Sequence, residues 1–174
     1  IPMRGRMIHD KSGELHFAPY DVDPNNCINS IGRAALNTTV IEAAQGYPNV
    51  RVRFNHRCTD VDLESATVHL IDATTESVIS ARGDAVLGVD GAYSAVRQSM
   101  QKTLSGFDYD ESYLAHGYKE LTIPPEPDGS WRLDKNALHI WPRKSFMMIA
   151  LPNPDGSFTC TLFWQFEGPR SFAT

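Results

Sequence analysis

The sequence predicts an α+β protein in which strands outnumber helices. Most apolar segments alternate with polar residues as strands do, only two segments have helical spacing, and turn-forming residues separate them. A chain of 174 residues is long enough to bury a sizeable core. Strands and helices alternate before residue 105 and strands dominate after it, which predicts a boundary between two lobes there.

The first lobe is expected to begin with a hairpin. Residues 4–9 and 14–18 have strand character, and the polar segment 10–13 predicts the turn between them. Apolar side chains at helical spacing predict a helix over Arg33–Gln45, which Gly46 and Pro48 end. Further strands are predicted at 49–54, 56–62, 67–71, 77–81 and 84–89, followed by a short helix over 94–100.

The second lobe is predicted to be a sheet with antiparallel connections. A long strand over 113–123 precedes a loop that begins at Pro124 and Pro125. Strands at 137–141, 146–151 and 158–166 then form a meander with turns at 142–144 and 153–156.

Composition and charge exclude several classes of protein. The net charge of −5 argues against a nucleic-acid binder, and the longest aliphatic and aromatic run is too short to span a membrane. Cys27, Cys58 and Cys160 form no CxxC pair, and the histidines show no metal-ligand spacing, so no metal site is predicted. The sequence shows no signal peptide, and neither end is typical of a natural terminus, so we expect a piece of a longer chain.

The most distinctive motif spans residues 88–97. An apolar strand is followed by Asp90 and Gly91, by Ser94 at the start of a helix, and by Arg97 within it. Asp90 and Ser94 are suited to cap that helix, Gly91 permits close backbone approach, and a helix N-terminus attracts phosphate. An Asp-Gly turn before a helix is common, so this motif alone does not define a function.

The whole pattern Asp-Gly-x-x-Ser-x-Val-Arg after a strand resembles the FAD-dependent aromatic hydroxylases, which are single-component flavin monooxygenases. Further segments resemble the members that hydroxylate L-kynurenine, in the order of that family: 1–9, 47–50, 54–57, 116–125, 138–143, 146–153 and 157–163. The resemblance implies an incomplete flavin-hydroxylase fold. Residues 1–105 would be an α/β part of the FAD domain with the first hairpin of the substrate lobe, and 106–174 the mostly antiparallel substrate sheet.

The resemblance also implies FAD as cofactor, NADPH as co-substrate and conversion of L-kynurenine to 3-hydroxykynurenine in tryptophan catabolism. The family's GxGxxG turn, its later Gly-Asp motif and its C-terminal helical part are absent from this sequence. The glycine-rich turn supplies much of the phosphate binding in such folds. We therefore expect the isolated chain to bind FAD poorly and to be inactive.

Five positions match the family's substrate-binding residues. Arg6 matches the arginine that binds the substrate carboxylate and Tyr20 its hydroxyl partner, although Arg4 has the same strand parity as Arg6. Met147, Ile149 and Phe163 match the apolar wall around the kynurenine ring. Without the resemblance, these residues would be interpreted as a surface arginine, a loop tyrosine and ordinary core.

Five other positions match residues that contact the flavin cofactor: Arg33, Cys58, Asp90, Gly91 and Ala95. No residue is assigned as a catalytic acid, base or nucleophile, because the cofactor carries the chemistry in this family.

Two alternatives stay open: a related hydroxylase of another aromatic acid, and a non-catalytic β-rich module that binds a small acid or a protein. A small-molecule substrate is expected, with no nucleic acid and no membrane segment in this chain. The compartment is expected to be the cytoplasm, or the mitochondrial outer membrane if the parent enzyme is eukaryotic, and the sequence does not indicate an oligomeric state.

Overall fold

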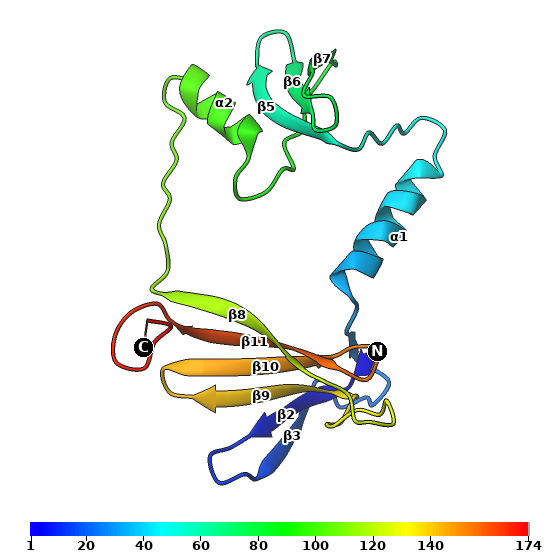
Figure 1. Cartoon of the computed structure of the whole chain (residues 1–174), viewed down its shortest axis with the longest axis vertical. Coiled ribbons are helices and arrows are strands. Elements are labelled where there is room, and N and C mark those ends of the chain that lie inside the picture. The colour runs from blue at the N-terminus through cyan, green and yellow to red at the C-terminus, as the bar shows by residue number, and fades with distance from the viewer. Residues whose placement is uncertain (174) are drawn as a thin grey trace. The chain divides into compact units, whose positions relative to one another are not determined.

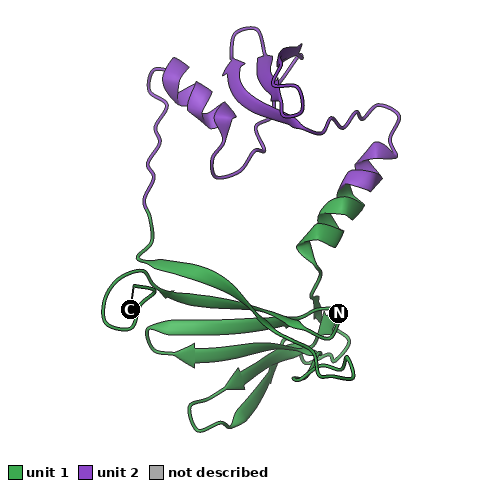
Figure 2. Cartoon of the chain, in the orientation of Figure 1, with its two compact units in different colours: residues 1–40, 113–174 green, residues 41–112 purple. Residues whose placement is uncertain are grey.

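The computed structural model describes residues 1–173, which divide into two compact units (Figure 2). Unit 1 combines residues 1–40 with residues 113–173, and unit 2 comprises residues 41–112. The predicted boundary between two lobes at residue 105 is a different division of the chain. It stays a prediction, and its last residue, Thr174, lies outside the described residues.

Unit 1 is built on a six-stranded sheet with the strand order β3-β2-β9-β10-β11-β8 (Figure 1). The neighbouring pairs are antiparallel except β2 and β9, which are parallel. The strands are β2 (Gly5–His9), β3 (Leu15–Pro19), β8 (His116–Ile123), β9 (Ala137–Arg143), β10 (Phe146–Pro152) and β11 (Phe158–Gln165). The short strands β1 (Pro2–Met3) and β4 (Ile28–Asn29) pair separately. The predicted mostly antiparallel sheet is confirmed.

The register of the sheet separates its side chains into two faces. Met147 on β10 lies opposite Phe163 on β11, and Ile149 lies opposite Thr161. Because side chains alternate along a strand, these four share one face, which we call the site face. Ala150, which lies between Ile149 and Leu151, belongs to the opposite face, which we call the core face.

The core face carries the buried centre of unit 1. Ala150, Phe158 and Cys160 are almost completely buried and pack against Trp131 from the loop between β8 and β9. The Trp131 Nε1 atom donates a hydrogen bond to the Asn153 carbonyl oxygen at 2.9 Å, which fixes that loop to the end of β10. The site face has no comparable cover from the described part of unit 1, and Met147 keeps 38% of its surface exposed.

The helix α1 (Arg33–Gln45) has the predicted bounds. It ends where Gly46 donates its backbone N–H to the Glu42 carbonyl oxygen, as the glycine at this position predicts. None of its side chains is fully buried. Within residues 1–173, no helix is long and apolar enough to cross a membrane.

Unit 2 contains an antiparallel three-stranded sheet and one helix. The strands β5 (His56–Asp62), β6 (Thr67–Asp72) and β7 (Val78–Arg82) follow in that order, and α2 (Ala95–Thr103) packs on β5. The Ser99 hydroxyl joins α2 to β5, because it donates to Asp60 Oδ1 at 2.5 Å and accepts from the Val61 backbone N–H at 3.0 Å.

Two predicted strands are wrong. Residues 49–54 and 84–89 have no strand in the structure. A strand requires a neighbour for its backbone N–H and C=O groups, and no other described segment pairs with either stretch. Their apolar side chains consequently remain open to solvent, most clearly Leu87 and Val89, which are 85% and 93% exposed.

Candidate functional site

Arg6 and Tyr20 form a cationic and hydroxyl pair at one edge of the unit 1 sheet. Arg6 lies on β2, and the Tyr20 backbone N–H donates to the Arg4 carbonyl oxygen just beyond the end of β3. The Arg6 guanidinium carbon lies 4.8 Å from the centre of the Tyr20 ring. Arg6 makes no ion pair with the described residues, and its side chain is exposed. The guanidinium is therefore oriented by an aromatic ring and remains available to an anion.

The Tyr20 hydroxyl is buried without a hydrogen-bond partner among the described residues. A buried hydroxyl that lacks a partner costs about 1–3 kcal/mol, which an acceptor placed beside it recovers. Its position next to the free Arg6 guanidinium makes the pair suitable for a carboxylate, since both groups can donate hydrogen bonds.

The apolar positions predicted from the resemblance lie on the same face as Arg6. The parallel register places Arg6 opposite Leu138 and Ile8 opposite Ile140. Ile140 in turn lies opposite Ile149 on β10. By strand alternation, Arg6, Met147, Ile149 and Phe163 all belong to the site face. Four of the five predicted substrate residues therefore share one surface, and the fifth, Tyr20, lies at its edge.

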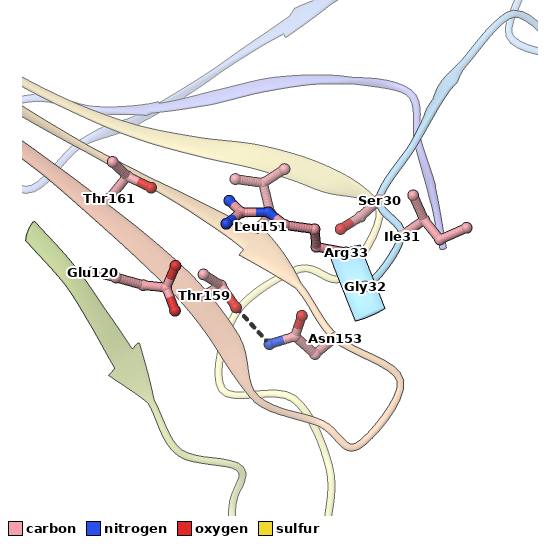
Figure 3. Close-up of a pocket in the computed structure, with 9 residues that line it drawn as sticks. All are labelled: Ser30, Ile31, Gly32, Arg33, Glu120, Leu151, Asn153, Thr159 and Thr161. Atoms are coloured by element: carbon pink, nitrogen blue, oxygen red, sulfur yellow. Dashed lines mark hydrogen bonds between the residues drawn. The ribbon is translucent and has the colours of Figure 1, made fainter. Parts of the chain in front are cut away.

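Arg33 lies over the same face, near Leu151 at the C-terminal end of β10. It lines a pocket of about 340 Å³ together with Leu151, Thr159, Thr161 and Glu120, as Figure 3 shows. The Arg33 side chain extends from the start of α1 above the sheet (Figure 3). Below it, Asn153 Nδ2 donates to Thr159 Oγ1 at 3.0 Å. Arg33 was predicted as a cofactor residue, and within unit 1 it adjoins the surface that carries the predicted substrate residues.

The other four predicted cofactor residues belong to unit 2. Asp90 and Gly91 lie in the turn before α2, and Ala95 is the first residue of α2. Asp90 Oδ1 accepts from the Ser94 hydroxyl at 2.6 Å, and Asp90 Oδ2 accepts from the Ala95 backbone N–H at 2.7 Å. Ser94 Oγ accepts from the Arg97 backbone N–H at 3.0 Å. The predicted capping is confirmed, and it uses the N–H groups that would otherwise attract phosphate at this helix end.

The Arg97 guanidinium holds the Asp-Gly turn from the other side. It donates to the carbonyl oxygens of Gly91 at 3.4 Å and Ala92 at 2.5 Å, and its guanidinium carbon lies 4.8 Å from the Tyr109 ring centre. Gly91 has a φ of +79°, and a Cβ there would meet no atom within 4 Å. The turn thus presents an open backbone in the left-handed conformation that favours glycine.

Electrostatics make these groups poor proton carriers near neutral pH. The Ser94 hydroxyl and backbone N–H groups lower the pKa of Asp90. Burial, followed by the charge of Asp90, raises the pKa of the Cys58 thiol. Asp90 therefore stays ionised as a cap, and Cys58 stays a thiol.

The structure adds site-face residues that the sequence reasoning missed. Tyr118 lies opposite Phe163, and their ring centres are 6.3 Å apart. Glu120 and Thr161 face each other on the neighbouring strands β8 and β11. The signal that could have found them is strand parity, but it required the pairing of β8 with β11, which the order of strands along the chain did not reveal.

The chain is similar in sequence to curated kynurenine 3-monooxygenases along nearly its whole length. It is 47% identical to that of Anopheles gambiae over 95% of the chain, and 48% identical to those of Myxococcus xanthus and Dictyostelium discoideum over 100%. The chain spans 34–37% of the length of these three relatives. No protein-family profile matches it.

Solved structures show the same fold at low sequence identity. PqsL of Pseudomonas aeruginosa, described as a probable FAD-dependent monooxygenase, is 17% identical with a TM-score of 0.65, covering 95% of this chain and 43% of that one. HpxO of Klebsiella pneumoniae, solved with FAD and uric acid, is 18% identical with a TM-score of 0.61, covering 99% and 42%. The fold of this chain is therefore part of the fold that these two proteins share.

Proposed function

We propose that the chain is a segment of an FAD- and NADPH-dependent monooxygenase that converts L-kynurenine to 3-hydroxykynurenine. Sequence similarity to kynurenine 3-monooxygenases over 95–100% of the chain supports the substrate class. The observation that carries the proposal is the site face itself. A free arginine beside a buried, unpartnered tyrosine hydroxyl stands at the edge of an apolar surface.

Arg6 and Tyr20 would bind the α-carboxylate of kynurenine. A guanidinium matches a carboxylate with two parallel N–H donors, and the Tyr20 hydroxyl would donate a third hydrogen bond. The 4.8 Å contact with the Tyr20 ring holds the guanidinium in place before the substrate arrives. This preorganisation reduces the entropy that substrate binding must lose.

Ile149, Met147 and Phe163 would form the floor beneath the aromatic ring. Ile149 lies two strands from Ile8, which is about 10 Å at the usual strand spacing, and Arg6 lies two residues before Ile8 on the same face. A substrate with a carboxylate at one end and an aromatic ring at the other spans a separation of that order once the length of the Arg6 side chain is included. The apolar floor excludes water from the ring that receives the oxygen atom.

When bound, FAD reduced by NADPH would supply the oxygen chemistry, so the protein's own contribution is binding and orientation. Arg33, Cys58, Asp90, Gly91 and Ala95 are the residues proposed to line the cofactor. The open left-handed Gly91 fits close approach by a ligand, whereas the capped start of α2 does not offer free N–H groups to a phosphate. Contact at this turn would therefore use the loop backbone.

The test is substrate affinity in the full-length enzyme that contains this segment. Tyr20→Phe removes one donated hydrogen bond and is expected to raise the kynurenine Kd about tenfold. Arg6→Lys replaces the planar fork with a single ammonium and is expected to raise it at least as much. Kd is measured from the change in flavin absorbance on titration with L-kynurenine.

Arg4→Lys is the matched control, because Arg4 is an exposed arginine two residues from Arg6. Its Kd should stay within about twofold of the parent value. A tenfold loss for Arg4→Lys with no change for Arg6→Lys would move the carboxylate site to the other arginine. If kynurenine fails to change the flavin spectrum of the parent enzyme while 4-hydroxybenzoate does, the enzyme is a hydroxylase of another aromatic acid.

A further inference from the structure

Four basic side chains gather at the hairpin end of the unit 1 sheet. Lys11, Arg143, Lys144 and Arg170 line a pocket of about 190 Å³ with Ser145 and Phe146. They come from three separate places: the turn between β2 and β3, the turn between β9 and β10, and the segment that follows β11. In a chain whose net charge is −5, such a concentration of positive charge is a local exception.

None of these cations has an acidic partner within residues 1–173. The nearest acids in sequence, Asp10 and Glu14, make contacts within their own turn and with His16. Asp10 Oδ1 accepts from the Ser12 hydroxyl and the Glu14 backbone N–H, and Asp10 Oδ2 lies 3.5 Å from His16 Nε2. The positive charges at the pocket are therefore available to an anion.

Arg143 is held in a fixed orientation by carbonyl oxygens rather than by a carboxylate. Its Nη1 donates to the His9 and Pro142 carbonyl oxygens at 2.9 Å, and its Nη2 donates to the Asp10 carbonyl oxygen at 3.0 Å. Carbonyl oxygens orient the guanidinium without cancelling its charge. Of the five N–H groups of an arginine, two remain for a ligand.

Two pocket residues also have a backbone conformation that L-amino acids rarely adopt. Lys144 has a φ of 42° and Arg170 a φ of 69°. Lys144 begins the two-residue turn between Arg143 and Phe146, a position where glycine is favoured. Strained residues of this kind concentrate at ligand-binding positions, and here both carry a charge into the same pocket.

We propose that this pocket binds a phosphate group. Arginine and lysine together suit a phosphate, because arginine supplies paired donors and lysine supplies a mobile charge. Arg143 and Phe146 belong to the core face by strand alternation, so the pocket is separate from the Arg6 and Tyr20 site on the opposite face. The proposal does not depend on the monooxygenase activity. The phosphate could be inorganic or the 2′-phosphate of a nucleotide.

The experiment is a calorimetric titration of the complete chain with inorganic phosphate, NADP⁺ and NAD⁺ at constant ionic strength. Tryptophan fluorescence provides a second readout, because the Trp164 ring centre lies 5.6 Å from that of Phe146 in the pocket wall. Binding of phosphate and NADP⁺ with similar affinity indicates a general phosphate site. Tight binding of NADP⁺ with weak binding of phosphate and NAD⁺ assigns the pocket to a nucleotide 2′-phosphate if Lys144→Gly weakens that binding.

Lys144→Gly is the diagnostic variant. It removes one charge and places glycine at a position of positive φ, so it should fold at least as stably as the parent chain while losing about tenfold in phosphate affinity. Lys119→Gln on β8 removes the same charge at an exposed position outside the pocket and should change affinity by less than about twofold. Absence of phosphate and NADP⁺ binding, or equal losses in both variants, would overturn the proposal.

Discussion

At the scale of single residues, Tyr20 and Ser99 show two states of a buried hydroxyl. The Tyr20 hydroxyl has no partner among the described residues, which fits a position that waits for a ligand. Ser99 is 2% exposed, and its hydroxyl makes hydrogen bonds with Asp60 and Val61 on β5. The Tyr20 hydroxyl is suited to binding and the Ser99 hydroxyl to stability. Loss of the first should change substrate affinity, and loss of the second should change the free energy of unfolding.

Ser99→Ala is expected to lower the free energy of unfolding of unit 2 by about 1–2 kcal/mol. It leaves the Val61 N–H at a buried position without its Ser99 acceptor and removes the donor to Asp60. Denaturant unfolding followed by circular dichroism measures the change. Ser80→Ala, at an exposed position on β7, is the control and should cost less than about 0.5 kcal/mol. Equal losses in both variants would show that Ser99 does not join α2 to β5 in solution.

At the scale of elements, the only parallel pair in the six-stranded sheet carries a linked pair of histidines. His139 Nε2 lies 2.9 Å from the Asp134 carbonyl oxygen, which can only accept, so Nε2 holds the proton. His139 Nδ1 must then accept from His9 Nε2 at 2.8 Å. His9 also stacks on Trp141 at 4.1 Å between ring centres. The neutral pair is thus a directed chain of hydrogen bonds between β2 and β9.

This pair should make unit 1 less stable in mild acid. Burial lowers the pKa of both histidines. The charge of His139, and then that of Arg143, lowers that of His9 further, while the bond to Asp134 partly opposes the effect at His139. The unfolded chain takes up protons below about pH 6.5, and the folded pair does so only at lower pH. Stability is therefore full above pH 6.5 and is lost as the pH falls toward the depressed folded values.

The measurement is the free energy of unfolding at pH 7.5 and pH 5.5. The parent chain should lose stability between these values, and His139→Gln should lose less, whatever its stability at pH 7.5. His9→Gln provides a second variant on the other strand. His16→Gln, at an exposed position on β3, should keep the full parental loss. A parental dependence that survives in both His9→Gln and His139→Gln would assign it to other groups.

The elements that the sequence predicted correctly are those whose signals are local. The bounds of α1 follow from apolar spacing and Gly46, and β5 follows from its own alternation and turns. Residues 49–54 and 84–89 have equally good strand patterns but no pairing neighbour among the described residues. Strand formation depends on a partner as well as on side-chain pattern, so the pattern alone predicted too much there.

The candidate site was predicted by resemblance in its residues but not in its geometry. Arg6 meets Tyr20 through the β2–β3 hairpin, but the shared face of Arg6 and Phe163 depends on the parallel contact of β2 with β9. That contact joins residues more than a hundred positions apart, which no local pattern reports. Unit 1 likewise combines two distant parts of the chain, because β2 and β3 from residues 1–40 join the sheet formed by residues 113–173.

At the scale of the whole molecule, long stretches without helix or strand join the packed elements. Residues 46–55 link α1 to β5, and residues 104–115 link α2 to β8. Arg51 and Arg53 are exposed within the first of these stretches. Arg143, by contrast, is half-buried and makes three hydrogen bonds to carbonyl oxygens. Access for a protease should differ accordingly.

Brief digestion of the native chain with trypsin should cut first after Arg51 or Arg53, because a protease needs an extended, accessible backbone. Mass spectrometry of the first products identifies the site. The double variant Arg51→Gln and Arg53→Gln should delay the first cut without changing the circular dichroism spectrum. First cleavage after Lys119 or Arg143, inside the sheet, would show that unit 1 opens more readily than the link between α1 and β5.

The alternation of the two sheet faces also limits how a gene for such a chain can change. Losing one codon early in β10 would shift every later residue of that strand to the opposite face. Ile149 and Leu151 would then lie on the core face with Phe158, and Ala150 would lie on the site face. Losing two neighbouring codons would shorten the strand and keep the faces intact. Length changes in this part of the gene should therefore be tolerated in pairs of residues within strands, and singly only in the turns.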